Sequence, residues 1–314
     1  MASSGLIKWF DSLLSSHPSS LLESPSSSAS SRLFDETLAL RLRSLLPVPC
    51  DSPGTPILWL ASALRVLSLT LSDAAAAFVA SDSLDSDVDY LDSSVALLDA
   101  CNAVSAEIAR VERRLLYLRL ALRCLTPDED GHDDDRPKSK LHCARKAVAE
   151  WENFPSREIG RYAGELIHRM APRCVESAAR RRVTYAAEEV SRLVIAAVVV
   201  ALGGREGKSP IGEMRVSCDW PWAEAFNQVA AAISDRLGAA LPLELEAVEA
   251  EVGTLARGIE REDVGDGVVA TVGRAAEELA AALEKLRESV NGTFQAATET
   301  RNALLNGLRA RYWS

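Results

Sequence analysis

The densest group of potential metal ligands in this chain is an acidic segment around His132. Its sequence is TPDEDGHDDDRPKSK, and its carboxylates are Asp128, Glu129, Asp130, Asp133, Asp134 and Asp135. Calcium loops need oxygen ligands at alternate positions and a glutamate at the end, and this spacing departs from that pattern. Pro127, Gly131 and Pro137 disfavour regular structure. We therefore predict a flexible, solvated acidic loop over residues 126–140 and no metal site.

The histidines and cysteines are not spaced like a catalytic or metal centre. The histidines are His17, His132, His142 and His168, and no two share a helical face. The six cysteines are Cys50, Cys101, Cys124, Cys143, Cys174 and Cys218, without a C-x-x-C pair. Cys101 and Cys124 fall within one predicted helix, too far apart to bond each other. We expect reduced thiols in a cytoplasmic protein.

Motifs of the common enzyme classes are absent from the sequence. It contains no G-x-S-x-G elbow, no G-x-x-x-x-G-K phosphate loop, no H-E-x-x-H and no G-x-G-x-x-G. The formal net charge of −10 repels polyanions, so nucleic-acid binding is not expected. We expect a protein that is not an enzyme, with no catalytic residue and no cofactor.

Two groups of side chains are candidates for contact with a partner or a membrane. Trp220 and Trp222 flank Pro221; exposed, they would anchor a partner, although packing into the core is the favoured reading. Arginines precede an apolar run, and the candidates among them are Arg180, Arg181 and Arg182. They suit anionic lipid headgroups, but pairing with the acidic excess of the chain is favoured.

The apolar run itself, Leu193 to Leu202, raises the question of membrane insertion. Ten residues make about 15 Å of helix, whereas a bilayer core is about 30 Å thick. We predict a buried core helix, with insertion of residues 193–202 into a membrane as the alternative.

The first thirty-one residues differ in composition from the rest. They are rich in serine and broken by Pro18 and Pro25, so residues 1–31 are predicted to be disordered. Trp9 and Phe10 lie on or beside one face of a short amphipathic stretch and are candidate membrane or partner contacts. We expect a cytoplasmic protein, with peripheral membrane contact or plastid targeting as alternatives.

These candidates must be positioned by helices. From Tyr90 to Leu125 there is no proline or glycine, and one stripe steps by three and four through Leu91, Val95, Leu98, Cys101, Val104, Ile108, Val111, Leu115, Leu118, Leu122 and Leu125. Arg110, Glu112, Arg113, Arg114 and Arg119 are placed off this stripe. A helix of this length predicts the central strut of an elongated all-α bundle built on long antiparallel helices.

Similar stripes recur on both sides of this helix. They run through Leu33, Leu38, Leu42 and Leu45; Ile57, Leu60, Leu64, Leu67 and Leu71; Phe226, Val229 and Ile233; and Leu245, Val248, Val252, Leu255 and Ile259. Further helices are predicted at 141–151, 159–170 and about 268–312. The helix that begins after Pro56 is expected to pack antiparallel against the long helix. Aromatic residues make up only 5% of the chain, which also favours helices over a sheet.

Four blocks of sequence resemble the plant BYPASS family. They are YLDSSVALLDACNAVSAEIARV, DWPWAEAFNQV, LELEAVEAEV and ETRNALLNGLR, in the family's order. The resemblance spans the chain from about Arg32 onward and implies one helical domain over 32–314. It implies a regulator of plant development that restrains production of a mobile root-derived signal able to arrest shoot growth. The alternative is a helical adaptor in membrane traffic that binds an exocyst-type subunit.

Overall fold

The regular structure described for this chain is helical throughout. The computed structural model describes residues 27–46, 56–80, 88–126, 137–155, 157–172, 182–203, 210–237 and 243–312. The helices are α2 (Ser27–Ser44), α3 (Ile57–Ala80), α4 (Val88–Leu125), α5 (Pro137–Asn153), α6 (Ala163–Arg169), α7 (Arg182–Gly203), α8 (Ala223–Leu237), α9 (Leu243–Glu260) and α10 (Asp266–Tyr312), with the 3-10 turns η1 (Glu158–Tyr162) and η2 (Pro210–Glu213). The predicted all-α fold is confirmed.

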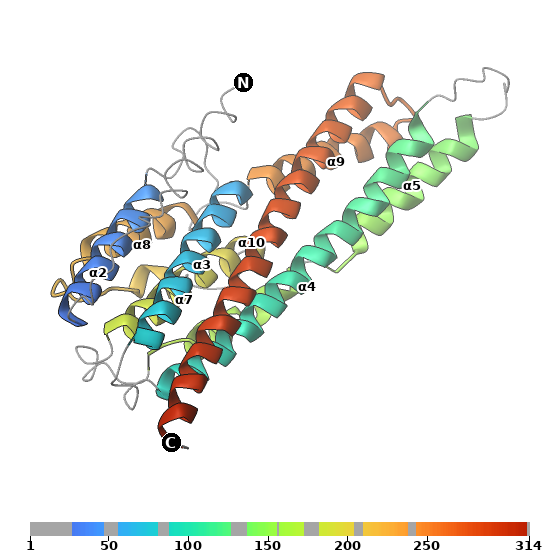
Figure 1. The fold of residues 1–314 in the computed structure, drawn as a ribbon. Coiled ribbons are helices and arrows are strands. Elements are labelled where there is room, and N and C mark those ends of the chain that lie inside the picture. The colour runs from blue at the N-terminus through green and yellow to red at the C-terminus, as the bar shows by residue number, and fades with distance from the viewer. Residues whose placement is uncertain are drawn as a thin grey trace, which may run out of the picture.

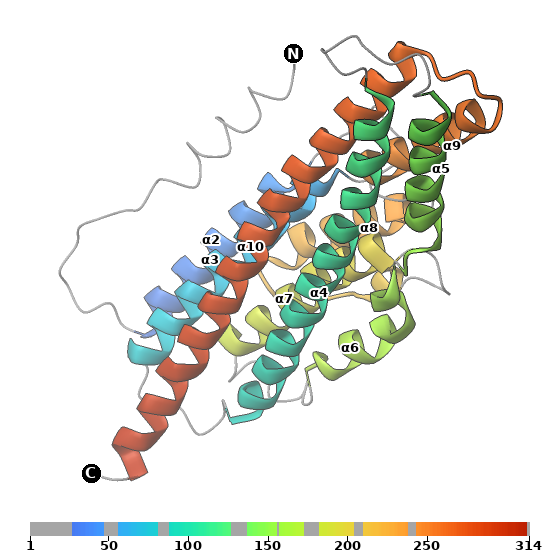
Figure 2. The same cartoon turned by 90° about the vertical axis from the view of Figure 1, so that its right-hand side faces the viewer.

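The molecule is elongated, and its two longest helices set its length. α4 and α10 run alongside each other, with α5 and α9 beside them at one end (Figures 1 and 2). At the other end α3, α7, α8 and α2 are added to one side of α10 (Figure 1). The bundle therefore has a thin end and a thick end.

α4 buries the predicted stripe through its middle. Cys101, Val104, Ile108, Val111, Leu115 and Leu118 are all 4% exposed or less. Two details of the prediction are wrong. Val95 is 39% exposed, and Ala96 and Leu97 are buried in its place. Arg114 is only 9% exposed, because it stands three residues after Val111 and four before Leu118, which puts it on the buried face.

The main packing partner of α3 is α10 and not α4. The side chains of Val272, Ala276, Leu279, Leu283, Leu286 and Val290 are buried in α10. Two threonine hydroxyls tie the seam: Thr293 Oγ1 lies 3.2 Å from the carbonyl oxygen of Leu64, and Thr300 Oγ1 lies 2.8 Å from that of Leu71. The expected packing of α3 against the long helix is wrong, since α3 lies mainly against α10 and α7.

Several helix boundaries differ from the prediction. α2 begins at Ser27, inside the segment 1–31 that was expected to be disordered, while residues 1–26 lie outside the described part of the chain. In α2, Leu33 is 61% exposed and Phe34 is buried in its place. α5 begins at Pro137, because proline fits the first turn of a helix, where its missing N–H has no intrahelical partner. The predicted loop 126–140 is therefore too long, and residues 127–136 lie outside the described part.

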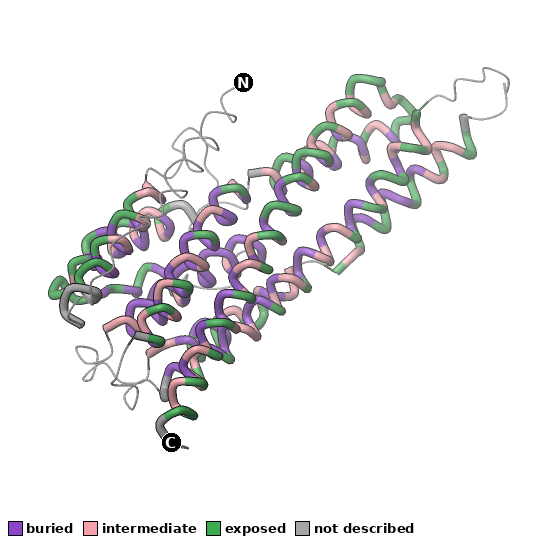
Figure 3. The backbone as a smooth tube through the Cα atoms, in the orientation of Figure 1, coloured by how far each residue is buried: buried purple, intermediate pink, exposed green. Residues whose placement is uncertain are grey.

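α7 is the most deeply buried helix (Figure 3). From Leu193 to Leu202 every side chain except the half-buried Val200 is buried, as predicted for a core helix. Among the described residues, the helix long and apolar enough to cross a membrane is instead α3, from Ile57 to Val79, by length and composition alone. In an 18-residue apolar window of that segment 61% of the residues are buried against the rest of the protein, and a core helix meets the same criterion.

Candidate functional site

The described contact candidates Arg182, Trp220 and Trp222 come together where α2, α7 and α8 meet. The ring centroids of Trp220 and Trp222 are 6.2 Å apart, and Tyr185 of α7 lies 5.6 Å from the first and 6.1 Å from the second. The Arg182 guanidinium stands 5.5 Å from the centre of the Trp220 ring and forms an ion pair with Asp35 of α2. We call Asp35, Arg182, Tyr185, Trp220 and Trp222 the aromatic–arginine cluster.

This cluster is built into the fold. Trp222 is 0% exposed, Trp220 is half-buried, and the Asp35 side chain is 0% exposed. Burying a carboxylate is costly unless a cation compensates it, and Arg182 supplies that charge. The cluster therefore joins α2 to α7 and α8, and Arg182 is engaged inside the protein. Trp220 and Trp222 thus pack against the core and Arg182 pairs with an acid, as the favoured interpretations of the sequence predicted.

The remaining contact candidates, Trp9, Phe10, Arg180 and Arg181, lie outside the described residues. Their role in partner or membrane contact stays a prediction. Arg192, further along α7, lies 3.8 Å from Glu189 one turn earlier.

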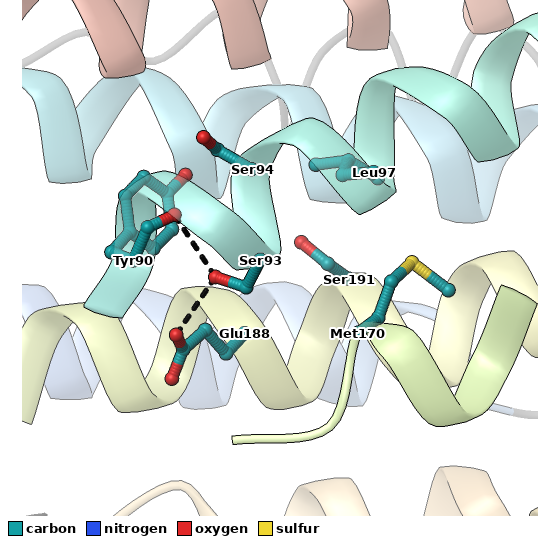
Figure 4. Close-up of a pocket in the computed structure, with 7 residues that line it drawn as sticks. All are labelled: Tyr90, Ser93, Ser94, Leu97, Met170, Glu188 and Ser191. Atoms are coloured by element: carbon teal, nitrogen blue, oxygen red, sulfur yellow. Dashed lines mark hydrogen bonds between the residues drawn. The ribbon is translucent and has the colours of Figure 1, made fainter. Parts of the chain in front are cut away.

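A second polar group lies between the start of α4 and the middle of α7. The Ser93 hydroxyl stands 2.8 Å from Oε1 of Glu188 and 3.0 Å from the carbonyl oxygen of Tyr90 (Figure 4). The Tyr90 side chain is buried, and burial together with the negative charge of Glu188 raises its pKa well above the usual value. These residues enclose a cavity of about 10 Å³, which has room for one water molecule and no larger ligand.

Glu189, the next residue of α7, has a strongly raised pKa. Only 7% of the residue is exposed, and burial raises the pKa of its carboxyl from 4.5 to about 7. Arg192 opposes this rise and Glu188 adds to it. A carboxyl with such a pKa changes charge near neutrality, so Glu189 makes the stability of α7 packing sensitive to pH.

A larger hollow opens on the surface near the start of α4. It has a volume of about 540 Å³ and lies between α4 and the end of α6, where Asp92, Val95, His168, Arg169 and Pro172 line it. Its lining mixes an acid, a base and apolar surface, and Arg169 is held by Asp99 at 2.7 Å. Such a groove suits a peptide or a side chain of a partner better than a tightly enclosed small molecule.

A third polar group joins α4, η1 and α9 near the middle of the molecule. Glu107, whose side chain is 0% exposed, accepts hydrogen bonds from the backbone N–H of Arg157 at 2.6 Å and of Ile159 at 3.2 Å. Glu249 accepts from the guanidinium groups of Arg157 at 2.9 Å and Arg114 at 3.0 Å. We call these residues the Glu107–Glu249 network. It holds the start of η1, which Arg157 precedes with a φ of 65°, against α4 and α9.

Arg114 connects this network to α5. Its Nε donates to the carbonyl oxygen of Trp151 at 2.9 Å, and its guanidinium lies 4.1 Å from the centre of the Trp151 ring. The stack and the hydrogen bonds fix one geometry, which an ammonium group cannot reproduce.

Asp35, Glu107 and Glu249 were not among the residues predicted from the sequence for a site, whereas Arg182 was. Glu107 stands three residues after Val104 and four before Val111, so its spacing marks it as lying on a buried face. That signal was present in the sequence. Nothing local indicates that Asp35 meets Arg182, because their contact joins residues 147 positions apart.

Comparison with known proteins finds distant plant relatives. No family profile and no solved structure matches the chain. "UPF0496 protein 4" from Oryza sativa subsp. indica and its counterpart from subsp. japonica are each 30% identical over 241 residues, which cover 69% of this chain and 51% of theirs. The chain thus spans about half the length of these relatives. "Protein BPS1, chloroplastic" from Arabidopsis thaliana is 25% identical over 316 residues, 94% of this chain and 89% of that protein.

Proposed function

We propose, from the homology of this chain to the BYPASS-related plant proteins, that it is a non-enzymatic regulator of plant development. The specific role implied by the resemblance is to restrain production of a mobile root-derived signal that arrests shoot growth. The observation that carries the proposal is the match to the Arabidopsis protein along 94% of this chain. A match of that extent relates the whole helical framework and not a single shared segment.

The polar groups of the described structure support this role because they hold the helices in one arrangement. Glu107, Arg114 and Glu249 are tied to backbone and to one another across α4, α5, η1 and α9. Arg182 and Asp35 join α2 to α7. These charged side chains maintain the shape of a long helical surface, which is the property that a binding regulator needs.

Complementation tests the proposal. The chain would be expressed in Arabidopsis thaliana plants that lack the BPS1 protein, and shoot growth would be compared with that of untransformed plants. We expect the wild-type chain to restore shoot growth. Two matched variants control for folding: Leu40→Asp, at a 65% exposed position of α2, should still restore it, and Leu118→Asp, at a 0% exposed position, should not. Accumulation of folded wild-type protein without any recovery would refute the proposal.

A second candidate function is that of an adaptor in membrane traffic with an exocyst-type subunit as partner. It is favoured by the outer face of α4, where Leu116 and Leu120 are 59% and 48% exposed one turn apart. Neighbouring exposed leucines are typical anchors for a helix of another protein. Affinity capture from plant cells with the wild-type chain should then recover exocyst subunits, and the double change of Leu116 and Leu120 to Ser should lose them. Equal recovery with both proteins would remove this face from the proposal.

We also propose a cytoplasmic location with weak contact to anionic membranes. Plastid import is the alternative, because the name of the Arabidopsis relative includes "chloroplastic". A fluorescent protein fused after Ser314 should show a cytoplasmic signal. A signal confined to plastids would contradict the proposal.

A further inference from the structure

Two cysteine side chains meet where α4 ends and α5 begins. The Sγ atoms of Cys124 and Cys143 are 2.6 Å apart, and both are free thiols. Cys124 lies in the last turn of α4, Cys143 lies in the first half of α5, and the two helices run side by side (Figures 1 and 2). Both residues are half-buried, so a small oxidant reaches them from solvent.

We propose that Cys124 and Cys143 are a modification site at which a reversible disulfide staples α4 to α5. A disulfide requires an S–S separation of about 2.05 Å, so the two sulfurs need only approach by a fraction of an ångström. The bond would close the chain across residues 125–142, which include the acidic segment. This proposal is independent of the developmental role and concerns a chemistry that neither the motifs nor the relatives indicate.

The oxidant is a small disulfide of the glutathione class. The thiolate of one cysteine attacks oxidised glutathione, which forms a mixed disulfide and releases one glutathione thiolate. The thiolate of the second cysteine then attacks the protein-side sulfur, which forms the Cys124–Cys143 bond and releases the second glutathione thiolate. The two thiol protons end on the two released glutathiones, and the two electrons lost by the protein reduce the oxidant. Excess reduced glutathione reverses both steps.

The other described cysteines lack this arrangement. Cys101 is 1% exposed in the core, so an oxidant in solution does not reach its thiol, and no sulfur partner is described beside it. Cys218 is exposed, and no other described cysteine lies within bonding reach of it. At Cys124, burial and then the adjacent Cys143 sulfur raise the pKa to about 11, so alkaline pH should accelerate closure of the bond.

Thiol trapping on the full-length protein tests the proposal. The purified chain would be equilibrated with mixtures of reduced and oxidised glutathione, blocked with N-ethylmaleimide, digested without reduction and analysed by mass spectrometry. We expect one cross-linked peptide pair, joined through Cys124 and Cys143, whose amount rises with the share of oxidised glutathione. Cys124→Ser and Cys143→Ser should each abolish it. Cys218→Ser is the matched control and should leave it unchanged.

Thermal unfolding supplies a second readout on the same samples. Closing a loop of this length should raise the Tm of the wild-type protein by about 5 °C, and Cys124→Ser and Cys143→Ser should show no such shift. Wild-type protein that carries only glutathione adducts at these positions, forms only disulfides between chains, or stays fully reduced would overturn the proposal. Circular dichroism spectra would verify that each variant is folded.

Discussion

At the scale of single residues, the described structure uses charged side chains as internal ties. Glu107, Arg114 and Asp35 are buried and Arg182 is half-buried, and each meets a partner from a different helix or turn. Removal of one member leaves the other charge buried without compensation, which costs more than the pair itself contributes. The residues that look most suited to chemistry therefore affect stability first.

Glu189 should make stability depend on pH. Its pKa is about 7 in the folded protein and 4.5 in the unfolded chain, so the folded state holds the proton more tightly. Below pH 4.5 the carboxyl is protonated in both states, and its contribution to the free energy of unfolding then falls as the pH rises to about 7. The fall is about 3 kcal/mol. Glu189→Gln removes it, and chemical denaturation at pH 5 and pH 8 would measure the difference.

The expected result is a variant that is more stable than wild type at pH 8 and similar to it at pH 5. Glu299→Gln, at an exposed position of α10, is the control of equal charge and should change neither value. A variant that is less stable than wild type at pH 8 would show that the ion pair with Arg192 outweighs burial at this position.

Arg114 should not tolerate replacement by lysine. Arg114→Lys keeps the positive charge but loses the Nε hydrogen bond to Trp151 and the planar stack at 4.1 Å. We expect the free energy of unfolding to fall by about 2 to 4 kcal/mol. The control is Arg113→Lys, since the adjacent Arg113 is exposed. Equal denaturation midpoints for both variants would show that charge alone matters at position 114.

At the scale of elements, α4 carries a wider buried face than one stripe of leucines indicates. Leu115 and Leu118 are 1% and 0% exposed, whereas Leu116 between them is 59% exposed. The close approach of η1 to α7 is a second element-scale feature: a Cβ on Gly160 would lie 2.6 Å from the carbonyl oxygen of Gly203. The face of the helix on which a residue lies thus decides whether that residue tolerates substitution.

A charge introduced on the buried face of α4 should unfold the bundle. Leu118→Asp places a carboxylate among apolar side chains, at a cost of several kcal/mol. Leu116→Asp changes the same residue type on the opposite face and should shift the Tm by at most about 2 °C. Thermal melts followed by far-ultraviolet circular dichroism would compare them. Similar melting curves for both variants would show that the stripe is assigned to the wrong face.

The contact between η1 and α7 offers a separate test. Gly160→Ala forces two backbone segments apart, because the added methyl group meets backbone at 2.6 Å. Gly164→Ala is the matched control, with nothing within 4 Å of the added Cβ. We expect a clear loss of thermal stability for the first change and none for the second. Wild-type stability of Gly160→Ala would show that the two elements are less closely packed.

At the scale of the whole molecule, the long apolar helices are satisfied by one another. The run from Leu193 to Leu202 lies in the core, and α3 packs on α10 and α7. We therefore expect the purified chain to remain in solution without detergent and carbonate to release it from any membrane fraction. Ultracentrifugation of extracted plant membranes would measure this. Retention after carbonate treatment would mean that α3 or α7 inserts and that the bundle opens to allow it.

The sequence by itself determined the helical class, most helix positions and most buried stripes. The stripes of α3 and α9 from Ile57 to Leu71 and from Leu245 to Ile259 are buried as predicted, because a step of three and four is a local property of a helix. The same local reasoning was able to place Trp222 and the α7 run in the core, since large apolar side chains gain most from burial.

Only the tertiary structure decided which helices meet and which polar groups pair. The backbone N–H of Ile57 at the start of α3 donates to the carboxylate of Glu244 in α9, at 3.0 and 3.2 Å, across 187 positions of sequence. Cys124 likewise meets Cys143, and the main neighbour of α3 is α10 and not α4. Periodicity shows which face of a helix is apolar, but many helices present the same kind of face. Their choice of neighbour depends on the packing of the entire bundle, which no single segment contains.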